Sequence, residues 1–266
     1  ALDEDGQDLT SNGLFAADDI LEAIIVAKQE AVLAGLPLMD SVLDTLAPDH
    51  GCAVEALASD GDAVSPGQTV GRITGPARIV LKAERVILNF ITHLSGIATL
   101  TASYAKELEG TSTTLLDTRK TLPGLRYPEK YAVLKGGGRN HRIDLEEMLM
   151  LKDNHIDRAG SITSAVQALR KAWSPCPPIE VECRTVEHVH EAVAAGADRI
   201  MLDNMNLEGI TQALALIPDP IESEVSGGVT LETIRSRGLC GPDYVSVGRL
   251  THSARAADFS MRIKTT

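Results

Sequence analysis

A dense group of cationic side chains occupies residues 119–142. Seven Lys or Arg residues and one His stand there against a single acid, Glu129, and they are Arg119, Lys120, Arg126, Lys130, Lys135, Arg139, His141 and Arg142. The whole chain has a formal net charge of -12, so the group does not follow from composition. It is either a solvated face or an anion site, since guanidinium groups pair with carboxylates and phosphates through two parallel hydrogen bonds. The turn Pro123-Gly124 and the three glycines at 136–138 favour the anion site, because glycine lets a backbone approach a ligand.

Two carboxylates, Glu182 and Asp203, follow later aliphatic stretches of the chain. A hard divalent cation, Mg²⁺, shared with the phosphates of a substrate would explain acids in a basic pocket. We therefore expect Glu182 and Asp203 to face a metal, mostly through substrate or water. A structural ion pair with Lys152 is the alternative.

Two glycine-containing segments near the end of the chain are candidates for a phosphate site. Ser226-Gly227-Gly228 and Val247-Gly248-Arg249 follow the last two aliphatic stretches, the place where barrel enzymes commonly bind phosphate at a helix N-terminus. A glycine turn that binds no ligand is the alternative. No nucleotide-binding P-loop pattern occurs in the chain.

These residues need elements that bring them together. Short aliphatic strands are predicted at residues 114–117, 148–151, 179–183, 199–202, 221–225 and 244–247, each followed by a helical pattern. Most are separated by roughly 20–35 residues, the length of a strand-helix unit. Such an alternation predicts a parallel sheet, which closes most economically into a barrel. A barrel gathers the carboxyl ends of its strands on one face, so the polar residues should converge in one pocket.

The earlier part of the chain predicts a smaller α+β unit. Strands are expected at residues 22–28, 31–34, 52–57 and 69–73, with a helix at 37–46. A long helix at 83–108 follows, and we expect a kink at Ser95-Gly96. The predicted domains are residues 1–96, with 253–266 packed on them, and the barrel at 97–252.

Composition excludes several classes of function. Aromatic residues make up 3% of the chain, and with the net negative charge this argues against nucleic acid and anionic membranes as partners. The four scattered cysteines predict reduced thiols rather than disulfides or a zinc site. The start of the chain has no basic, apolar leader, and aliphatic runs such as residues 23–27 are too short to span a bilayer, so we expect a cytoplasmic protein.

Several long strings of the sequence resemble the quinolinate phosphoribosyltransferase family, and the likeness extends essentially from end to end. They are Asp117-Thr118-Arg119-Lys120-Thr121-Leu122-Pro123-Gly124-Leu125-Arg126, Lys130-Tyr131-Ala132-Val133, Gly136-Gly137-Gly138, Asn140-His141-Arg142, Lys152-Asp153-Asn154-His155, Glu180-Val181-Glu182, Leu202-Asp203-Asn204, Glu84-Arg85, Asn89, residues 93–99, Asp3-Glu4-Asp5 and Asp8-Leu9-Thr10. Ile143-Asp144 and Arg249 depart from the usual family pattern.

The resemblance implies an α/β fold, namely an N-terminal open-faced α/β sandwich followed by an incomplete seven-stranded α/β barrel. It also implies a homodimer, with the possibility of a higher oligomer, in which Arg85 reaches the partner's site. By the same likeness, the substrate-binding residues are Arg85, Thr118, Arg119, Lys120, His141, Arg142 and Lys152. The phosphoribosyl and phosphate binders are Glu182, Asp203, Ser226, Gly227, Gly228, Val247, Gly248, Arg249 and His252, and the catalytic group is Lys120, Lys152, Glu182 and Asp203.

The reaction implied by the resemblance converts quinolinate and phosphoribosyl pyrophosphate into nicotinate mononucleotide, pyrophosphate and CO₂, with Mg²⁺ as cofactor, in NAD biosynthesis. A relative acting on nicotinate or a pyrimidine is the nearest alternative, and the number of cations favours the diacid quinolinate. A barrel that binds phosphorylated ligands without turnover is the alternative outside catalysis. The acids Glu182 and Asp203 argue against it, because binding an anion gains nothing from carboxylates.

Overall fold

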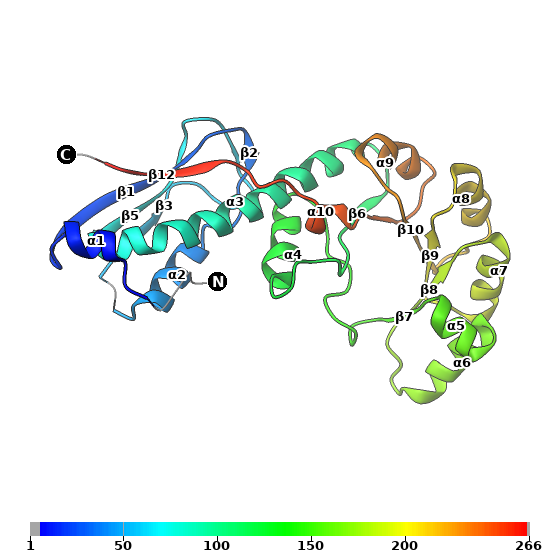
Figure 1. Ribbon diagram of the computed structural model, residues 1–266. Helices are drawn as coiled ribbons and strands as arrows, with labels where there is room; N and C mark the ends of the chain where they lie inside the picture. The colour runs from blue at the N-terminus through cyan, green and yellow to red at the C-terminus, as the bar shows by residue number, and fades with distance from the viewer. Residues whose placement is uncertain (1–5, 50, 265–266) are drawn as a thin grey trace. The chain divides into compact units, whose positions relative to one another are not determined.

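Strand β1 (Ile20–Ala27) lies inside the first sheet of the computed structural model, which describes residues 6–49 and 51–264 (Figure 1). Its alternate residues Ala23, Ile25 and Ala27 are buried, as the period of two requires. The antiparallel sheet has the order β12-β1-β5-β3, with β3 (Ala53–Ala56), β5 (Thr69–Pro76) and β12 (Phe259–Ile263). Three of the four predicted strands of this part thus lie in this sheet, and β12 is an additional strand.

Two helices pack apolar faces on this sheet. Helix α2 (Leu38–Leu46) contributes Met39, Val42 and Leu43, and α3 (Ala77–Glu107) contributes a stripe at helical spacing to the same aliphatic core. Helix α1 (Leu9–Leu14) is capped by the Asp8 carboxylate, and β2 (Ala31–Val32) pairs with β4 (Ala63–Val64). The family-like string Asp3-Glu4-Asp5 lies outside the described residues.

Helix α3 continues through Ser95-Gly96, so these two residues do not end the helix. A Cβ atom on Gly96 would lie 2.1 Å from the carbonyl oxygen of Arg255, so the close crossing of the C-terminal segment explains the glycine. Among the described residues, α3 alone is long and apolar enough to cross a membrane by length and composition. Because 56% of its most apolar stretch is buried in the protein, its apolar character is that of a core helix.

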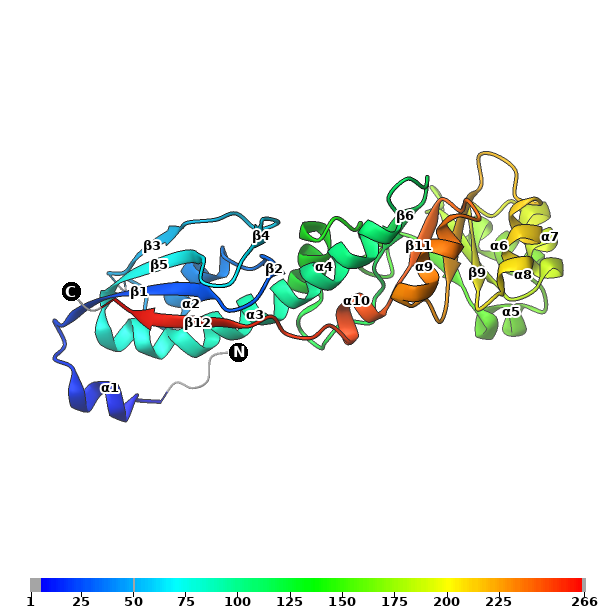
Figure 2. The same cartoon turned by 90° about the horizontal axis from the view of Figure 1, so that it is seen from above.

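The chain divides into two units by its internal contacts. The first holds residues 1–102, 128–137 and 253–266, and the second holds residues 103–127 and 138–252. Most of α4 (Arg126–Lys135) therefore counts with the first unit, whereas the sequence division placed it in the barrel. The C-terminal strand β12 lies beside β1 in the first unit, as Figure 2 shows.

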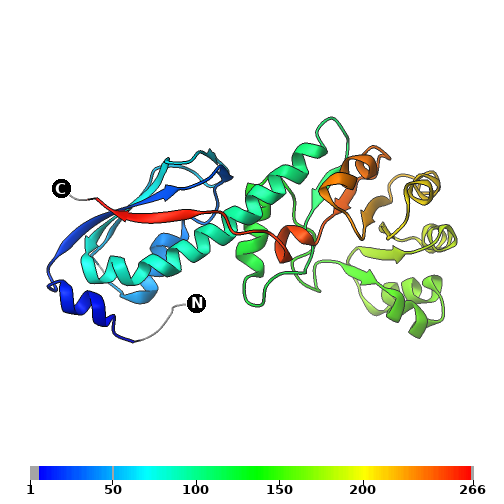
Figure 3. The same cartoon turned by 45° about the horizontal axis from the view of Figure 1, so that its top comes forward.

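The second unit contains an all-parallel sheet of six strands among the described residues, in the order β6-β11-β10-β9-β8-β7. Its strands are β6 (Thr114–Leu116), β7 (Leu149–Leu151), β8 (Ile179–Cys183), β9 (Arg199–Asp203), β10 (Glu222–Ser226) and β11 (Tyr244–Ser246). Helices α5 (Asp153–Ala159), α6 (Ile162–Ala172), α7 (Val186–Ala195), α8 (Leu207–Leu214), α9 (Leu231–Gly238) and α10 (Arg249–His252) alternate with them. Figures 1 and 3 show α5 to α8 along the outer side of the strands.

The seventh strand of the predicted barrel is reduced to one residue. Arg139 forms a single parallel bridge with Leu116 on the free edge of β6, and the described residues contain no pairing between Arg139 and β7 at the other edge. Glycines at 136–138 precede Arg139, which leaves little room for a longer strand. The barrel is therefore incomplete, as expected, and within residues 6–49 and 51–264 it has six strands and a one-residue bridge in place of the seventh.

Candidate active site

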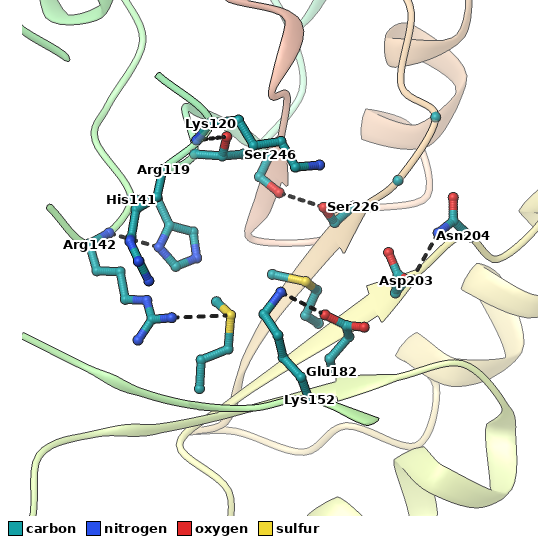
Figure 4. Close-up of a pocket in the computed structure, with 15 residues that line it drawn as sticks. Arg119, Lys120, His141, Arg142, Lys152, Glu182, Asp203, Asn204, Ser226 and Ser246 are labelled. Carbon is teal, nitrogen blue, oxygen red and sulfur yellow. Dashed lines mark hydrogen bonds and ion pairs between the residues drawn. The ribbon is translucent and has the colours of Figure 1, made fainter. Parts of the chain in front are cut away.

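A pocket of about 450 Å³ lies at the carboxyl ends of the parallel strands in the second unit (Figure 4). Its lining consists of Thr118, Arg119, Lys120, His141, Arg142, Met150, Lys152, Glu182, Met201, Asp203, Asn204, Ser226, Gly227, Gly228 and Ser246. Lining residues on one strand stand two positions apart, because alternate residues of a strand face the same side. Examples are Met150 with Lys152, which directly follows β7, and Met201 with Asp203 on β9. The predicted convergence on one face of the barrel is thus present.

One wall of the pocket is cationic and comes from the loops after β6 and after Arg139. The backbone N–H of Lys120 donates to Thr118 Oγ1 over 3.1 Å, and Thr251 Oγ1 donates to the carbonyl of Lys120 over 2.7 Å. The guanidinium of Arg142 donates to the carbonyl of Met148 over 2.7 Å. Burial, and then the nearby charge of Arg119, lower the pKa of Arg142. Such a wall favours a ligand with several negative charges.

The opposite side carries the two acids. Lys152 Nζ lies 3.2 Å from Glu182 Oε2, so the ion pair that we gave as an alternative is present. Arg184, which the sequence reading did not include, lies 3.3 Å from Glu182 Oε1, 3.7 Å from Asp203 Oδ2 and 3.0 Å from Asp153 Oδ2. Both acids therefore already have a cationic partner, and a metal ion at either one would compete with Arg184.

A tight turn closes the pocket beside Asp203. Asn204 adopts a left-handed backbone with φ 57°, its N–H donates to the carbonyl of Ser226, and its side-chain amide donates to Asp203 Oδ2 over 2.9 Å. A Cβ atom on Gly227 would lie 2.3 Å from Asn204 Oδ1, and the φ of Gly227 is 87°, so only glycine fits there. Asn204 stands in a family-like string, yet we had not assigned it to the site.

A second layer of charge lies beneath the pocket. Glu180 and Glu224 are fully buried, and their Oε2 atoms lie 3.2 and 3.3 Å from His141 Nε2. Arg199 Nη1 lies 3.6 Å from Glu224 Oε2 and Arg199 Nη2 lies 2.6 Å from Glu222 Oε2. Glu180 and Glu224 stand two positions before the pocket residues Glu182 and Ser226 on the same strands. Because alternate residues of a strand face the same side, their side chains also point into the barrel.

The charges of this layer shift the pKa values of its members. Burial would lower the pKa of His141, but the carboxylates of Glu180 and Glu224 beside Nε2 outweigh burial and raise it to about 9. Burial, and then the charge of Glu224, raise the pKa of Glu180 to about 7. Burial would also raise the pKa of Glu224, but His141 and Arg199 hold it below its ordinary value.

Several predicted site residues do not line this pocket. Strand β11 ends at Ser246, whose hydroxyl donates to Ser226 Oγ, and the chain then turns into α10, so Val247 is buried and Arg249 and His252 are exposed. Gly248 is outside the lining but close to it, since a Cβ atom there would lie 3.1 Å from Lys120 Cδ.

Several other residues singled out in the sequence lie outside the pocket. Arg85 is exposed on α3 in the first unit. A Cβ atom on Gly136 would lie 2.4 Å from the carbonyl oxygen of Ala98, so this glycine serves close packing on α3 instead of ligand binding. Asp144, a departure from the family pattern, accepts the N–H groups of Glu146 and Glu147 and so shapes a turn. None of the four cysteines, all of which lie in the described part of the chain, forms a disulfide.

Comparisons with known proteins agree with the geometry. The chain matches the family "Quinolinate phosphoribosyl transferase, N-terminal domain" over residues 8–95 and "Quinolinate phosphoribosyl transferase, C-terminal domain" over residues 97–262. It is 43% identical to the probable nicotinate-nucleotide pyrophosphorylase (carboxylating) of Bacillus subtilis, over 96% of this chain and 88% of that one.

Solved structures are similar as well. The crystal structure of NadC from Streptococcus pyogenes matches with a TM-score of 0.91 and 42% identity, over 97% of this chain and 91% of that chain. The nicotinate-nucleotide pyrophosphorylase from Francisella tularensis matches with a TM-score of 0.93 and 37% identity, over 98% of this chain and 92% of that chain.

Proposed function

Because the chain belongs to the quinolinate phosphoribosyltransferase family, we propose that it transfers the phosphoribosyl group of phosphoribosyl pyrophosphate to quinolinate with loss of CO₂. The products are nicotinate mononucleotide and pyrophosphate, and the reaction belongs to NAD biosynthesis. The observation that carries the proposal is the two-sided pocket. A cationic wall with Arg119, His141 and Arg142 faces the acids Glu182 and Asp203 in one cavity at the ends of the barrel strands.

The cationic wall suits the diacid. Quinolinate carries two carboxylates on adjacent ring positions, and Arg119 and Arg142 offer the planar donor pairs that bind carboxylates through two hydrogen bonds. Lys120 and Lys152 add single ammonium charges that neutralise the phosphoribosyl donor and its leaving group. A monoacid such as nicotinate would leave part of this wall without a partner, which is why we place quinolinate first.

The chemistry requires positioning more than a nucleophilic side chain. The ring nitrogen of quinolinate forms a bond to the anomeric carbon as the bond from that carbon to pyrophosphate breaks, with the electron pair leaving on pyrophosphate. The carboxylate next to the nitrogen then leaves as CO₂, the released pair is held by the pyridinium ring, and a proton replaces it. Carboxylates such as Glu182 and Asp203 suit the ribose hydroxyls and the developing positive charge at the anomeric carbon.

Magnesium is part of the proposal. The carboxylate oxygens of Glu182 and Asp203 are the hard donors that Mg²⁺ prefers, and bound Mg²⁺ would neutralise the charge on pyrophosphate. Since Arg184 and Lys152 already contact these acids, contact through water or pyrophosphate fits better than direct ligation by both. In keeping with a metabolic enzyme of this charge, we place the protein in the cytoplasm.

We also propose a homodimer with shared sites, supported by the exposed position of Arg85 on α3 and by the family resemblance. Mixing inactive Arg85→Ala and Lys152→Ala proteins under subunit exchange should restore up to about half of the activity per heterodimer, since one site would then carry neither change. No recovery despite exchange would assign Arg85 to its own chain.

The central test is release of labelled CO₂ from quinolinate carrying ¹⁴C in the carboxyl group next to the nitrogen. Release should require phosphoribosyl pyrophosphate and should increase with Mg²⁺. Transfer to nicotinate in place of quinolinate would favour the alternative substrate, and binding without release would favour the non-catalytic alternative.

A further inference from the structure

His141 is held on both sides of its ring. Its Nε2 lies 3.2 Å from Glu180 Oε2 and 3.3 Å from Glu224 Oε2, and its Nδ1 accepts the backbone N–H of Arg142 over 2.7 Å. Its own backbone N–H donates to the buried Asp117 carboxylate over 2.8 Å. The ring thus connects the pocket wall to the charged layer beneath it, although neither glutamate lines the pocket.

These contacts define where the ring carries its proton. Two carboxylates at Nε2 require a hydrogen on that nitrogen, because acceptors facing a lone pair would repel it. A lone pair on Nδ1 then accepts the N–H of Arg142, and the guanidinium of Arg142 in turn donates to Met148. The Nε2–H tautomer therefore connects the buried carboxylates to the backbone that carries Arg142.

We propose that Glu180 and Glu224 are positioning residues for the proposed reaction, which keep a hydrogen on Nε2 of His141, fix the ring, and so hold the adjacent Arg142 at the pocket wall. They act through His141 and do not contact the ligand. The inference rests on the proposed function for the ligand, whereas the state of the His141 ring can be measured without it.

The charged surroundings of His141 come from four strands. Below the ring lie Glu180 on β8, Arg199 on β9 and Glu224 on β10, and Glu222 on β10 is connected to them through Arg199. Asp117, which accepts the backbone N–H of His141, follows β6. Arg119 and Arg142 lie on the pocket side. The two glutamates favour a second proton on the ring, which raises its pKa. The bond from Arg142 N–H opposes that proton, because a protonated Nδ1 could not accept it. The carboxylates therefore raise the pKa of His141 and the Arg142 N–H opposes that rise, and the carboxylates have the larger effect.

A metal ion is the competing occupant of this cluster. The ligand atoms of His141, Glu180 and Glu224 lie within 4.8 Å of one another, which is close enough to share a cation. Arg199 already places a positive charge 3.6 Å from Glu224, so the geometry favours a cluster completed by protein groups.

The first experiment records ¹⁵N chemical shifts of the imidazole in substrate-free protein labelled on histidine, with His141→Gln used for assignment. We expect a hydrogen on Nε2 throughout the pH range in which the protein is folded, and Nδ1 as the nitrogen that titrates. A ring with its single hydrogen on Nδ1 would overturn the proposal. So would replacement of the hydrogen on Nε2 by Mg²⁺ or Zn²⁺ added alone, because the cluster would then be a metal site.

The second experiment compares Glu180→Gln and Glu224→Gln with the matched control Glu222→Gln. Glu222 lies on the same strand as Glu224 and pairs with the same Arg199, but it does not contact His141. The control variant therefore removes a neighbouring carboxylate and leaves the contacts of His141 in place. The two test variants should lower the pH at which His141 titrates by about one to three pH units, since each loses an opposite charge beside the ring. The control should leave that titration unchanged.

Kinetics complete the test. In both test variants the KM for quinolinate should rise about tenfold or more, because the ring beside Arg142 is no longer held at Nε2 by both carboxylates. The KM for phosphoribosyl pyrophosphate should change less than about threefold. Equal effects on both substrates, or equal effects of the control, would reduce the glutamates to a general structural role and overturn the inference. If wild-type protein releases no CO₂, the proposed function fails, and the ring measurements still decide the inference.

Discussion

The core of the first unit and the interior of the second differ in what fills them. Between the first sheet and helices α2 and α3, the buried cluster consists of aliphatic residues, a methionine and one phenylalanine. Inside the strands of the second unit, Glu180, Glu224 and Arg199 occupy positions that barrels usually give to Val, Ile or Leu. The first arrangement stabilises by removing apolar surface from water, whereas the second depends on mutual neutralisation of buried charges. The second can therefore respond to pH and to ligands, whereas the buried aliphatic cluster of the first contains no titratable side chain.

The largest effect on stability should come from the apolar core. Ile73 is fully buried on β5, and Ile73→Ala should lower the free energy of unfolding by about 2–5 kcal/mol, because it removes apolar contacts and leaves a cavity. Urea unfolding measures the change. The catalytic rate per folded molecule should stay near the wild-type value, and a large loss of rate at unchanged stability would show that the two regions are not separate in their roles.

The pocket should show the opposite behaviour. Arg119→Ala should weaken quinolinate binding by roughly 1.5–3 kcal/mol, the range for a charge-assisted pair, with little change in the free energy of unfolding. Calorimetric titration of each substrate measures it, with the exposed Arg158→Ala as a control for loss of a cation. If the affinity for phosphoribosyl pyrophosphate fell equally, Arg119 would contribute general positive charge to the pocket and would not bind the diacid specifically.

The charged interior should make stability depend on pH. The pKa of His141 is raised to about 9, so its stabilising contribution is complete below the ordinary value near 6.5 and is lost as pH rises through 9. Glu180, whose pKa is raised to about 7, adds a loss in the same direction at lower pH. We expect the free energy of unfolding to fall by about 1–3 kcal/mol between pH 6.5 and 9.

Urea titrations at several pH values would measure this dependence. The fall should be smaller in His141→Gln, which lacks the titrating ring. Stability that increased from pH 6.5 to 9 in the wild type would contradict the direction that we assign to His141.

The smallest expected effect concerns the edge of the pocket. Arg184 is about half exposed and contacts both Glu182 and Asp203. Arg184→Gln should lower the Mg²⁺ concentration needed for half-maximal rate by a few fold, because it removes a competing cation. Asp203→Asn should raise that Mg²⁺ concentration. Opposite shifts in the two variants would show that Arg184 and Mg²⁺ compete for the same carboxylates. Mn²⁺ binding followed by electron paramagnetic resonance would measure the same competition without turnover.

The sequence predicted the order of the strands and helices better than it predicted which charged side chains are buried. The aliphatic stretches at 179–183 and 199–202 correspond to strands β8 and β9, and the residues that follow β6, β7 and β9 meet in one pocket because parallel strands end on one face. Glu180 was read only as part of a string, although it shares the alternation of Glu182. The energetic reason is that a buried carboxylate needs a cation from another strand, which a local pattern does not show.

Residues whose roles depend on distant contacts were harder to predict. Arg184 contacts Asp203 from the next strand, and Gly96 and Gly136 are small because other segments cross α3 closely. A glycine that allows close packing and one that allows a turn look alike in sequence. Gly227 combines both constraints, since its φ is positive and a Cβ atom there would meet the side chain of Asn204.

The C-terminal strand has a consequence for the order of events during synthesis. Strand β12 pairs with β1 from Ala27↔Phe259 to Ala23↔Ile263, so one edge of the first sheet is supplied by residues that are synthesised after the strands of the barrel. Until then, β1 has an unpaired edge, while every strand of the barrel has already been made. The barrel can therefore assemble on the nascent chain before the N-terminal sheet is complete, and a truncated chain would expose an edge open to pairing with other chains.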